Sequence, residues 1–192
     1  MKAVTILGRG PSWKECRFNT EELWGTATCL ATEGLKDKKY TKVFAFDDDA
    51  LVKQCLVIAK ERNIPFVSQR EFATEHYPLI EIAREFRSSY FMPTISYMIA
   101  YALYLKYDRL WIYGIDQGPR WDYQAGKSHI MFWLGVAIGR KVNLRIGRGS
   151  LRWSYGLGLN ELPKLMFEED NLANHIGLEI REQEIFLAKG EV

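Results

Sequence analysis

Short apolar runs alternate along the chain with longer stretches in which apolar residues recur at helical spacing. Apolar runs that stop at glycine, proline or charged residues are typical of buried strands. Six segments have this pattern: 4–7, 26–31, 42–46, 64–67, 109–113 and 142–146. Three segments have helical spacing: 50–62, 95–106 and 130–138. The alternation predicts an α/β fold, with a mostly parallel sheet and helices on both faces.

The same pattern predicts where the domain ends. Residues 95–106 are apolar nearly all round, as in a helix buried on every side, whereas the polar and aromatic residues 119–128 predict a loop. After Tyr155 the periodicity fades. We therefore expect a single domain over residues 1–157, with a C-terminal appendage, residues 158–192, packed on it.

Composition narrows the class of protein. The chain has 192 residues, 47% hydrophobic and 26% charged, and a net charge of +2. That balance gives no reason to expect nucleic acid or an acidic membrane as partner. Three cysteines without C-x-x-C spacing are typical of reduced thiols, and neither a signal peptide nor a membrane-length apolar run is found. We expect a cytoplasmic protein; a homo-oligomer stays open.

The turn after the first predicted strand is the strongest functional signal. It reads Gly8-Arg9-Gly10-Pro11-Ser12, and Ser12 with Glu15 has the spacing of a capping box. Glycines let backbone N–H groups approach an anion, and a helix N-terminus adds positive charge. We expect this turn to hold a phosphate, as in Rossmann-like folds. Trp13 replaces the third glycine of the NAD fingerprint, and a turn that binds nothing stays open.

Two later segments place polar groups at strand and helix ends. Thr94 and Ser96 open the helix 95–106 and can cap its free N–H groups. If this helix and the one after the glycine turn begin at the same sheet edge, they can share one phosphate. Asp116 follows the strand 109–113, where a carboxylate accepts bonds from sugar hydroxyls or holds a metal-bound water. Capping alone is the structural alternative for Thr94 and Asp116.

Candidate groups for proton transfer and metal binding are few. His129 lies at the end of the predicted loop and, with Tyr123 nearby, can act as a general base; a surface histidine is the alternative. Residues 47–49 are all aspartate, but a position before a helix favours capping over metal binding, so a divalent cation such as Mg²⁺ stays open. Ser-His-Asp order, zinc spacing and a Gly-Lys-Thr loop are absent, which excludes those hydrolases, zinc sites and ATPases.

A basic segment precedes the appendage. It holds Arg140, Lys141, Arg145, Arg148 and Arg152, with Trp153 and Tyr155 close by. Basic residues among aromatic ones can bind nucleic acid. Acidic residues elsewhere balance the charge, however, so the phosphate end of a nucleotide pocket or a solvated face fits this segment better than nucleic acid.

The order of the motifs resembles the Rossmann-like superfamily of bacterial sialyltransferases, with its phage and bacterial relatives and the archaeal hydroxymethylpterin diphosphokinase group. The likeness covers residues 3–156 and is carried by Gly8-x-Gly10-Pro11-Ser12, Thr94-x-Ser96-Tyr97-Met98, Gly114-Ile115-Asp116 and Ser150-Leu151. In the sialyltransferases the corresponding turn and helix start hold the phosphate and ribose of a CMP-sugar. The resemblance implies a place near the sugar for Asp116 and nucleotide contacts for Gly8, Gly10, Ser12, Thr94 and Ser96.

The chain departs from that family at two positions. Arg9 stands where those enzymes usually have asparagine, and a guanidinium can bind phosphate bidentately. Their catalytic histidine precedes a late helix, and His129 matches it in position only. We expect a nucleotide or nucleotide-sugar binder that, if it is an enzyme, transfers a glycosyl or phosphoryl group. The alternative is a non-catalytic, phage-type protein that binds or sequesters a nucleotide; the base, sugar and acceptor stay open.

Overall fold

Strands and helices alternate along the part of the chain that the computed structural model describes, which is residues 1–46, 50–116, 121–147 and 150. The strands there are β1 (Ala3–Leu7), β2 (Glu22–Thr26), β3 (Lys42–Phe44), β4 (Phe66–Ser68), β5 (Glu75–His76), β6 (Arg109–Tyr113) and β7 (Asn143–Ile146). The helices are α1 (Ala50–Glu61), α2 (Leu79–Phe86), α3 (Thr94–Tyr104) and α4 (Trp121–Gly139), with 3-10 helices η1 (Pro11–Glu15) and η2 (Ala27–Ala31). None of these helices is long and apolar enough to cross a membrane.

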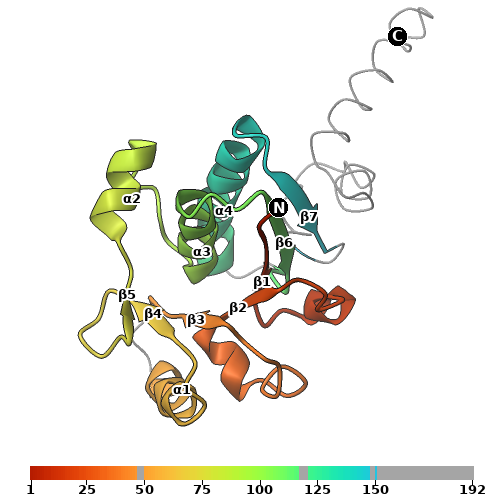
Figure 1. Ribbon diagram of the computed structural model, residues 1–192, viewed down its shortest axis with the longest axis vertical. Helices are drawn as coiled ribbons and strands as arrows, with labels where there is room; N and C mark the ends of the chain where they lie inside the picture. The colour runs from red at the N-terminus through yellow and green to blue at the C-terminus, as the bar shows by residue number, and fades with distance from the viewer. Residues whose placement is uncertain (47–49, 117–120, 148–149, 151–192) are drawn as a thin grey trace, which may run out of the picture.

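All the described strands run parallel in one sheet with the order β5-β4-β3-β2-β1-β6-β7 (Figure 1). The chain first builds from β1 towards one edge and then returns to add β6 and β7 on the other side of β1. β1 and β6 pair from Ala3 opposite Arg109 to Leu7 opposite Tyr113. The predicted Rossmann-like α/β fold is confirmed, and the strand order reverses between β1 and β6.

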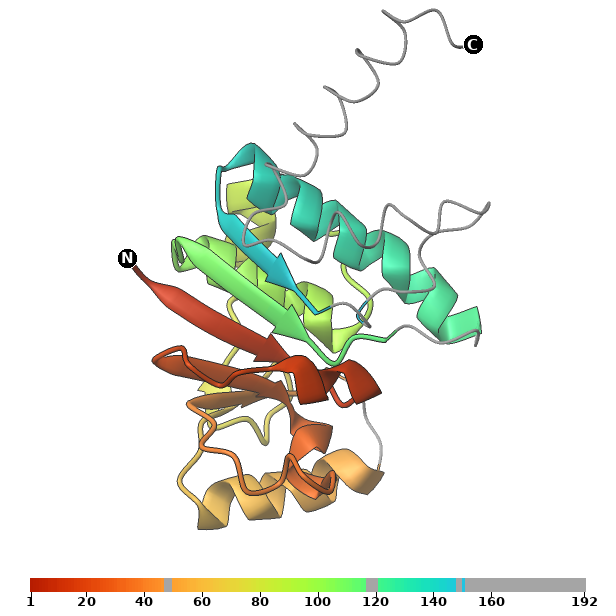
Figure 2. The same cartoon turned by 90° about the vertical axis from the view of Figure 1, so that its right-hand side faces the viewer.

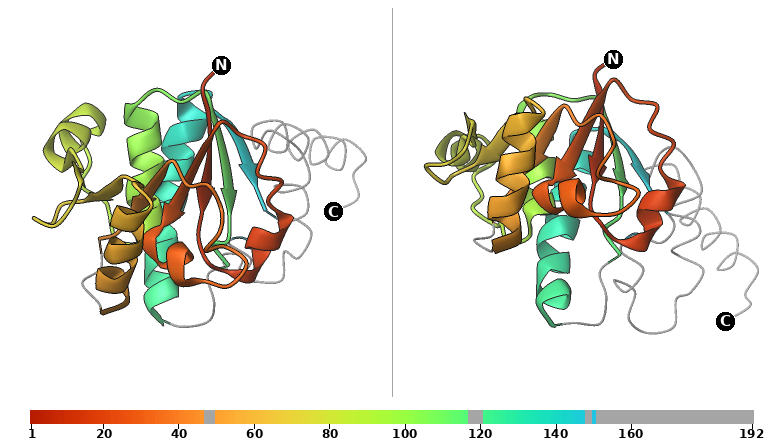
Figure 3. Two further views of the ribbon diagram at one scale, coloured as in Figure 1. Left: turned by 60° about the horizontal axis from the view of Figure 1, so that its bottom comes forward. Right: turned by 90° about the horizontal axis from the view of Figure 1, so that it is seen from below.

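Alternate strand residues face two separate cores. On one face, side chains such as Ile6, Ile112 and Leu144 pack with α2, α3 and α4. On the other face, residues such as Leu7 and Val43 pack with the segments of η1, η2 and α1. Figure 3 looks onto the second face, with α3 and α4 behind the sheet. The predicted placement of helices on both faces is therefore confirmed.

The second strand lies earlier in the chain than predicted. β2 ends at Thr26, and residues 27–31 form η2, so the strand predicted over 26–31 is wrong. Gly25 lies inside β2, where the Tyr40 ring packs against it. A Cβ at Gly25 would lie 2.6 Å from Cε1 of Tyr40. The pattern also did not predict β5 or α2. Pro78 is the N-cap of α2.

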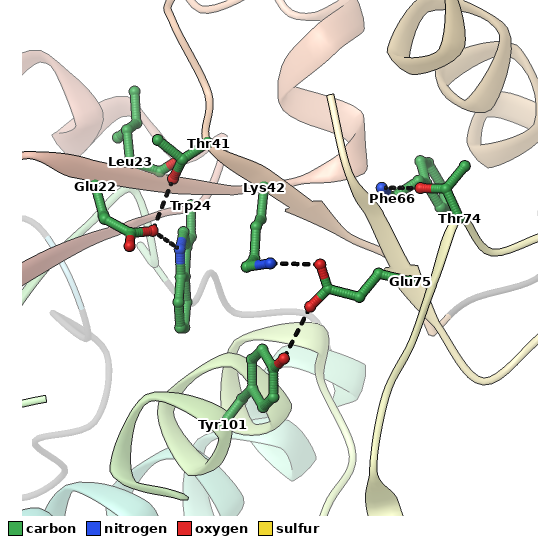
Figure 4. A network of polar contacts seen from close by, with 9 residues as sticks. All are labelled: Glu22, Leu23, Trp24, Thr41, Lys42, Phe66, Thr74, Glu75 and Tyr101. Atoms are coloured by element: carbon green, nitrogen blue, oxygen red, sulfur yellow. Dashed lines mark hydrogen bonds and ion pairs between the residues drawn. The ribbon is translucent and has the colours of Figure 1, made fainter. Parts of the chain in front are cut away.

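A polar network joins the amino ends of the outer strands to α3 (Figure 4). Lys42, the first residue of β3, forms an ion pair with Glu75, the first residue of β5. The hydroxyl of Tyr101, near the end of α3, donates to Oε1 of Glu75 over 2.8 Å. These contacts fasten the short strand β5 to the helix layer at the amino edge of the sheet.

Glu22 forms a second part of the amino edge. Its Oε2 accepts hydrogen bonds from Nε1 of Trp24 over 2.9 Å and from the hydroxyl of Thr41 over 3.1 Å. Burial alone would raise the pKa of this carboxyl. Hydrogen bonds from Trp24, Tyr107 and Thr41, helped by the charge of Lys2, outweigh that effect and lower the pKa below its ordinary value of 4.5. At the amino edge the carboxylates of Glu22 and Glu75 are thus paired with side chains of the same chain.

Candidate functional site

Two glycine loops meet at the carboxyl ends of β1 and β6, the edge to which the arrowheads point in Figure 2. The N–H of Gly8 donates to the carbonyl of Tyr113 over 2.9 Å, and that of Gly10 donates to the carbonyl of Gly114 over 2.8 Å. A Cβ on Gly8 would lie 2.3 Å from the Gly114 carbonyl oxygen, and Gly114 has φ +71°. The close backbone contact thus requires glycine at both positions, independently of any ligand.

Ser12 ties the loop after β1 to the chain after β6 and β7. Its N–H and its hydroxyl both donate to Oδ2 of Asp116, over 2.9 Å and 2.6 Å. Because its one hydroxyl proton is used there, its Oγ accepts from the N–H of Gly114 (3.0 Å) and from the hydroxyl of Ser150 (2.8 Å). The Oγ of Ser150 accepts from the N–H of Ile115 over 3.4 Å. Both serines are buried, so this chain of bonds fixes the position of Asp116.

The backbone of the glycine turn is bonded within the protein. Asp116 occupies the N–H of Ser12, where the sequence predicts a phosphate, and the N–H groups of Gly8 and Gly10 bond to the facing loop. The helix that follows, η1, is a five-residue 3-10 helix with Gly10 as N-cap, so the predicted capping box at Ser12 is wrong. Arg9 is exposed in this turn. Its guanidinium is therefore the charged group of the turn that solvent can reach.

Helix α3 begins at the same edge of the sheet. It precedes β6 and runs back along the sheet, on the face opposite η1. Pro93 is the N-cap and Thr94 the first helical residue. The hydroxyl of Ser96 donates to the carbonyl of Pro93 over 2.8 Å and accepts from the N–H of Met92 over 3.3 Å. Thr94 and Ser96 are buried, so they belong to a packed first turn at the rim.

His129 lies inside α4, which begins at Trp121. The loop predicted over residues 119–128 is therefore wrong from residue 121 onward. Its Nδ1 is 3.1 Å from the carbonyl oxygen of Ala125. The Oγ of Ser128 lies 3.3 Å from the same Nδ1, so this nitrogen is engaged within α4, and the structure records no hydrogen bond for Nε2 among the described residues. The ring stacks on Tyr90 with 3.9 Å between centroids. Within the described residues, no hydrogen bond or ring contact joins His129 to Asp116.

Lys127 is a buried cation that the sequence patterns did not indicate. It belongs to the first half of α4, whose start lies at the carboxyl edge of the sheet (Figure 2), and is 6% exposed. Desolvation by burial lowers its pKa. The neighbouring Gly126 packs close to the start of α3, since a Cβ there would lie 3.2 Å from Cγ of Pro93. One feature of the sequence could have indicated it: Lys127 is the one Lys, Arg, Asp or Glu among residues 125–139.

The basic segment is divided between the two faces of the sheet. Arg140, at the end of α4, lies over the ring of Phe86, 4.1 Å from its centroid, and contacts Glu85. Arg145 lies on the other face, with its guanidinium 5.5 Å from the centroid of Trp111. These two residues therefore do not belong to one continuous basic surface.

Other predictions fall outside the described residues. These are the acidic run 47–49, the side chain of Tyr123, the C-terminal appendage 158–192, and Arg148, Arg152, Trp153 and Tyr155 of the basic segment. Among the described residues, no three His, Cys, Asp or Glu side chains are grouped so that they could hold a metal ion.

No protein-family model and no curated protein sequence matches the chain. Similar solved structures include thiamine pyrophosphokinase from Bacillus subtilis, with 16% identity and a TM-score of 0.46 over 76% of this chain. The chain spans 59% of that protein's length. The sialyltransferase CstII from Campylobacter jejuni in complex with CMP-3FNeuAc is similar with 15% identity and a TM-score of 0.43, over 81% of this chain and 84% of that one. At these identities the comparisons concern the fold alone.

Proposed function

We propose that this protein binds a nucleotide or nucleotide-sugar at the carboxyl edge of its sheet, beside the loops 8–12 and 114–116. The observation that carries the proposal is the reversal of strand order between β1 and β6. In open α/β sheets, ligands bind in the crevice outside the carboxyl ends of the strands at such a reversal. At the amino edge, by contrast, Glu22 and Glu75 already have partners within the chain.

Side chains, more than backbone amides, make the proposed contacts with phosphate. Arg9 is exposed and can pair with a phosphate through two parallel hydrogen bonds. Lys127 brings a second positive charge to the same edge. Gly8 and Gly10 serve by letting the two loops approach, and Thr94 and Ser96 set the first turn of α3 at the rim. This division of roles follows from the amides of Gly8, Gly10 and Ser12 being already bonded.

Asp116 is proposed to receive sugar hydroxyls. Its Oδ2 is held by both donors of Ser12, whereas its Oδ1 has one longer contact, 3.2 Å from the N–H of Ser12. Carboxylate oxygens accept more than one hydrogen bond, so Oδ1 keeps acceptor capacity for a hydroxyl or for a water bound to Mg²⁺. Ser12 thus acts as a positioning residue for Asp116.

The proposed reaction is transfer of a glycosyl or phosphoryl group from the bound nucleotide to an acceptor hydroxyl. His129 takes the hydroxyl proton, the acceptor oxygen bonds to the transferred group, and the bond from that group to the nucleotide breaks, so that the remaining nucleoside phosphate leaves. Nε2 is the atom proposed to take the proton, because Nδ1 faces the Ala125 carbonyl and the Ser128 hydroxyl within α4. Tyr123, in the first turn of the same helix, is the second candidate for that proton. The non-catalytic alternative keeps the binding contacts and omits this step.

Binding is tested by thermal shift with CMP, a CMP-sugar, ATP and pyrophosphate, each with and without Mg²⁺. A ligand that prefers the folded state raises the melting temperature. The Arg9→Ala variant should bind about 10- to 100-fold more weakly, since a hydrogen bond to a charged group contributes about 1.5–3 kcal/mol. Arg84→Ala, which removes an exposed arginine from α2, is the matched control. Absence of any shift in the whole panel would contradict the proposal.

Turnover separates an enzyme from a sequestering protein. After incubation with a binding nucleotide and a mixed set of acceptors, product analysis should detect transfer by the wild type. The His129→Ala variant should keep the nucleotide affinity and lose transfer. Binding without turnover, unchanged in His129→Ala, would establish the non-catalytic alternative.

A further inference from the structure

One strip of the sheet carries positive charge, an aromatic ring and two buried polar atoms. Arg109 and Trp111 of β6 lie opposite Asn143 and Arg145 of β7 in the sheet register, and all four point away from the face that packs on α4. We call this set the β6–β7 face. The guanidiniums of Arg109 and Arg145 lie 5.9 and 5.5 Å from the Trp111 ring centroid. The face is therefore a cationic surface built around an indole.

Two atoms of this face are buried without a hydrogen-bond partner among the described residues. They are Nε of Arg109, a donor, and Oδ1 of Asn143, an acceptor. A buried polar group that lacks its hydrogen bond costs about 1–3 kcal/mol, and more if charged. The polar groups of this strip are therefore not all satisfied by the described residues.

On this side of the sheet the short helix η1 contacts β6, and the longer helix α1 packs elsewhere. α1 packs on η2 and β4, and in the strand order β4 lies far from β7. Sheets made only of parallel strands are normally covered on both faces. The β6–β7 face thus has a position in the fold that a further segment would be expected to fill.

The chain itself supplies a segment of the complementary charge. Residues 158–192 hold eight acidic and three basic residues, whereas residues 1–157 hold 16 acidic and 23 basic ones. The last described residue, Ser150, is buried and hydrogen-bonds Gly147 directly after β7, so the chain leaves the sheet beside this face. A strand such as β7 extends about 3.3 Å for each residue, so its length is short. The 42 residues that follow Ser150 are ample to reach back along it.

We propose that the acidic C-terminal segment, residues 158–192, docks on the β6–β7 face of the same chain. Its carboxylates pair with Arg109 and Arg145, and its apolar side chains cover Trp111. The appendage then completes the second face of the sheet and keeps the indole from solvent. This proposal does not depend on nucleotide binding at the carboxyl edge.

Hydrogen exchange on the chain of residues 1–192 tests the docking. Amides of residues 158–192 should be protected in the wild type. In the Arg109→Glu/Arg145→Glu variant their exchange should rise at least about tenfold, the effect of losing roughly 1.4 kcal/mol of local stability. The matched control is Lys53→Glu/Lys60→Glu, which makes the same charge change on the exposed side of α1 and should leave the segment protected.

A salt titration of the wild type keeps the test informative if the double variant does not fold. At about 1 M NaCl, screening should release the segment while β1 and β6 stay protected. An unprotected segment in the wild type, or protection unchanged in the double variant, would overturn the proposal. Protection that falls on dilution would overturn it as well, because a second copy of the chain would then be the partner.

Discussion

The hydroxyl of Ser12 lies 2.6 Å from Oδ2 of Asp116, although the two residues are 104 positions apart in the chain. The bond joins the loops after β1 and β6, the two neighbouring strands between which the strand order reverses. It also explains why a small hydroxyl residue is buried there: its single oxygen accepts from Gly114 and Ser150 and donates to Asp116. The carboxylate is thereby fixed at the carboxyl edge.

Removing that hydroxyl should destabilise the fold. In Ser12→Ala the N–H of Gly114 and the carboxylate of Asp116 each lose a partner, so the free energy of unfolding should fall by about 1–3 kcal/mol. Urea denaturation followed by circular dichroism measures this. The control, Ser89→Ala at an exposed position, should change stability by less than about 0.5 kcal/mol. Equal midpoints for the two variants would show that the Ser12 bonds contribute nothing.

The glycine contact gives a sharper stability test. Alanine at 114 would need φ +71° and would bring its Cβ to 2.2 Å from the carbonyl oxygen of Gly8. A left-handed conformation alone costs alanine about 1–2 kcal/mol, and the overlap adds to it. We expect Gly114→Ala to lower the melting temperature strongly or to prevent folding.

Gly135 is the matched control for that substitution. It lies within α4, and a Cβ there would meet nothing within 4 Å. Gly135→Ala should therefore stabilise the protein by about 0.5–1 kcal/mol, since alanine is the better helix former. A Gly114→Ala protein as stable as the wild type would contradict the backbone contact described between β1 and β6.

Stability at the amino edge should depend on pH through Glu22. Its pKa in the folded protein lies below 4.5, so ionised Glu22 stabilises the fold above that pH. The contribution is lost as the pH falls through the lowered pKa. Glu22→Gln should be less stable than the wild type at neutral pH and should show a smaller loss on acidification. Thermal denaturation from pH 7 to 3 measures it, with the exposed Glu21→Gln as control.

The cysteines should be inert in the native state. Cys16, Cys29 and Cys55 are all buried, and burial raises the pKa of Cys29 to about 11. The thiolate is the reactive form, so little of it is present near neutral pH. A colorimetric disulfide reagent should label none of the three thiols in the folded protein and all three in denaturant. Rapid labelling of one native thiol would show that its surroundings open readily.

The sequence predicted those elements whose pattern is decided locally. β6, α1 and α3 were found because apolar spacing, strand-forming residues and a proline mark them within a few positions. β2 was misplaced because a glycine disfavours a strand when only its neighbours are considered. Gly25 lies in β2 packed against Tyr40, which is fifteen positions further along the chain. The first turns of α4 were missed for a similar reason: Gly126 packs against Pro93, which is distant in the sequence.

The candidate site was predicted only in outline. That the glycine turn, Thr94 and Asp116 lie at the carboxyl edge follows from their places at strand and helix ends. Which groups bond to one another does not, because the pairing of Ser12 with Asp116 and Ser150 depends on the register of β1, β6 and β7. Lys127 was missed because burial of a lysine depends on how α4 packs.

The central claim is that a nucleotide binds at the carboxyl edge beside the loops after β1 and β6. Amide chemical shifts of the ¹⁵N-labelled protein, recorded during titration with the nucleotide that gives the largest thermal shift, test it most directly. We expect the largest changes at Arg9, Gly10 and Asp116, with little change at the amino-edge residues Glu22 and Glu75. Changes concentrated at the amino edge, or no change near Arg9 and Asp116 at saturating nucleotide, would contradict the account.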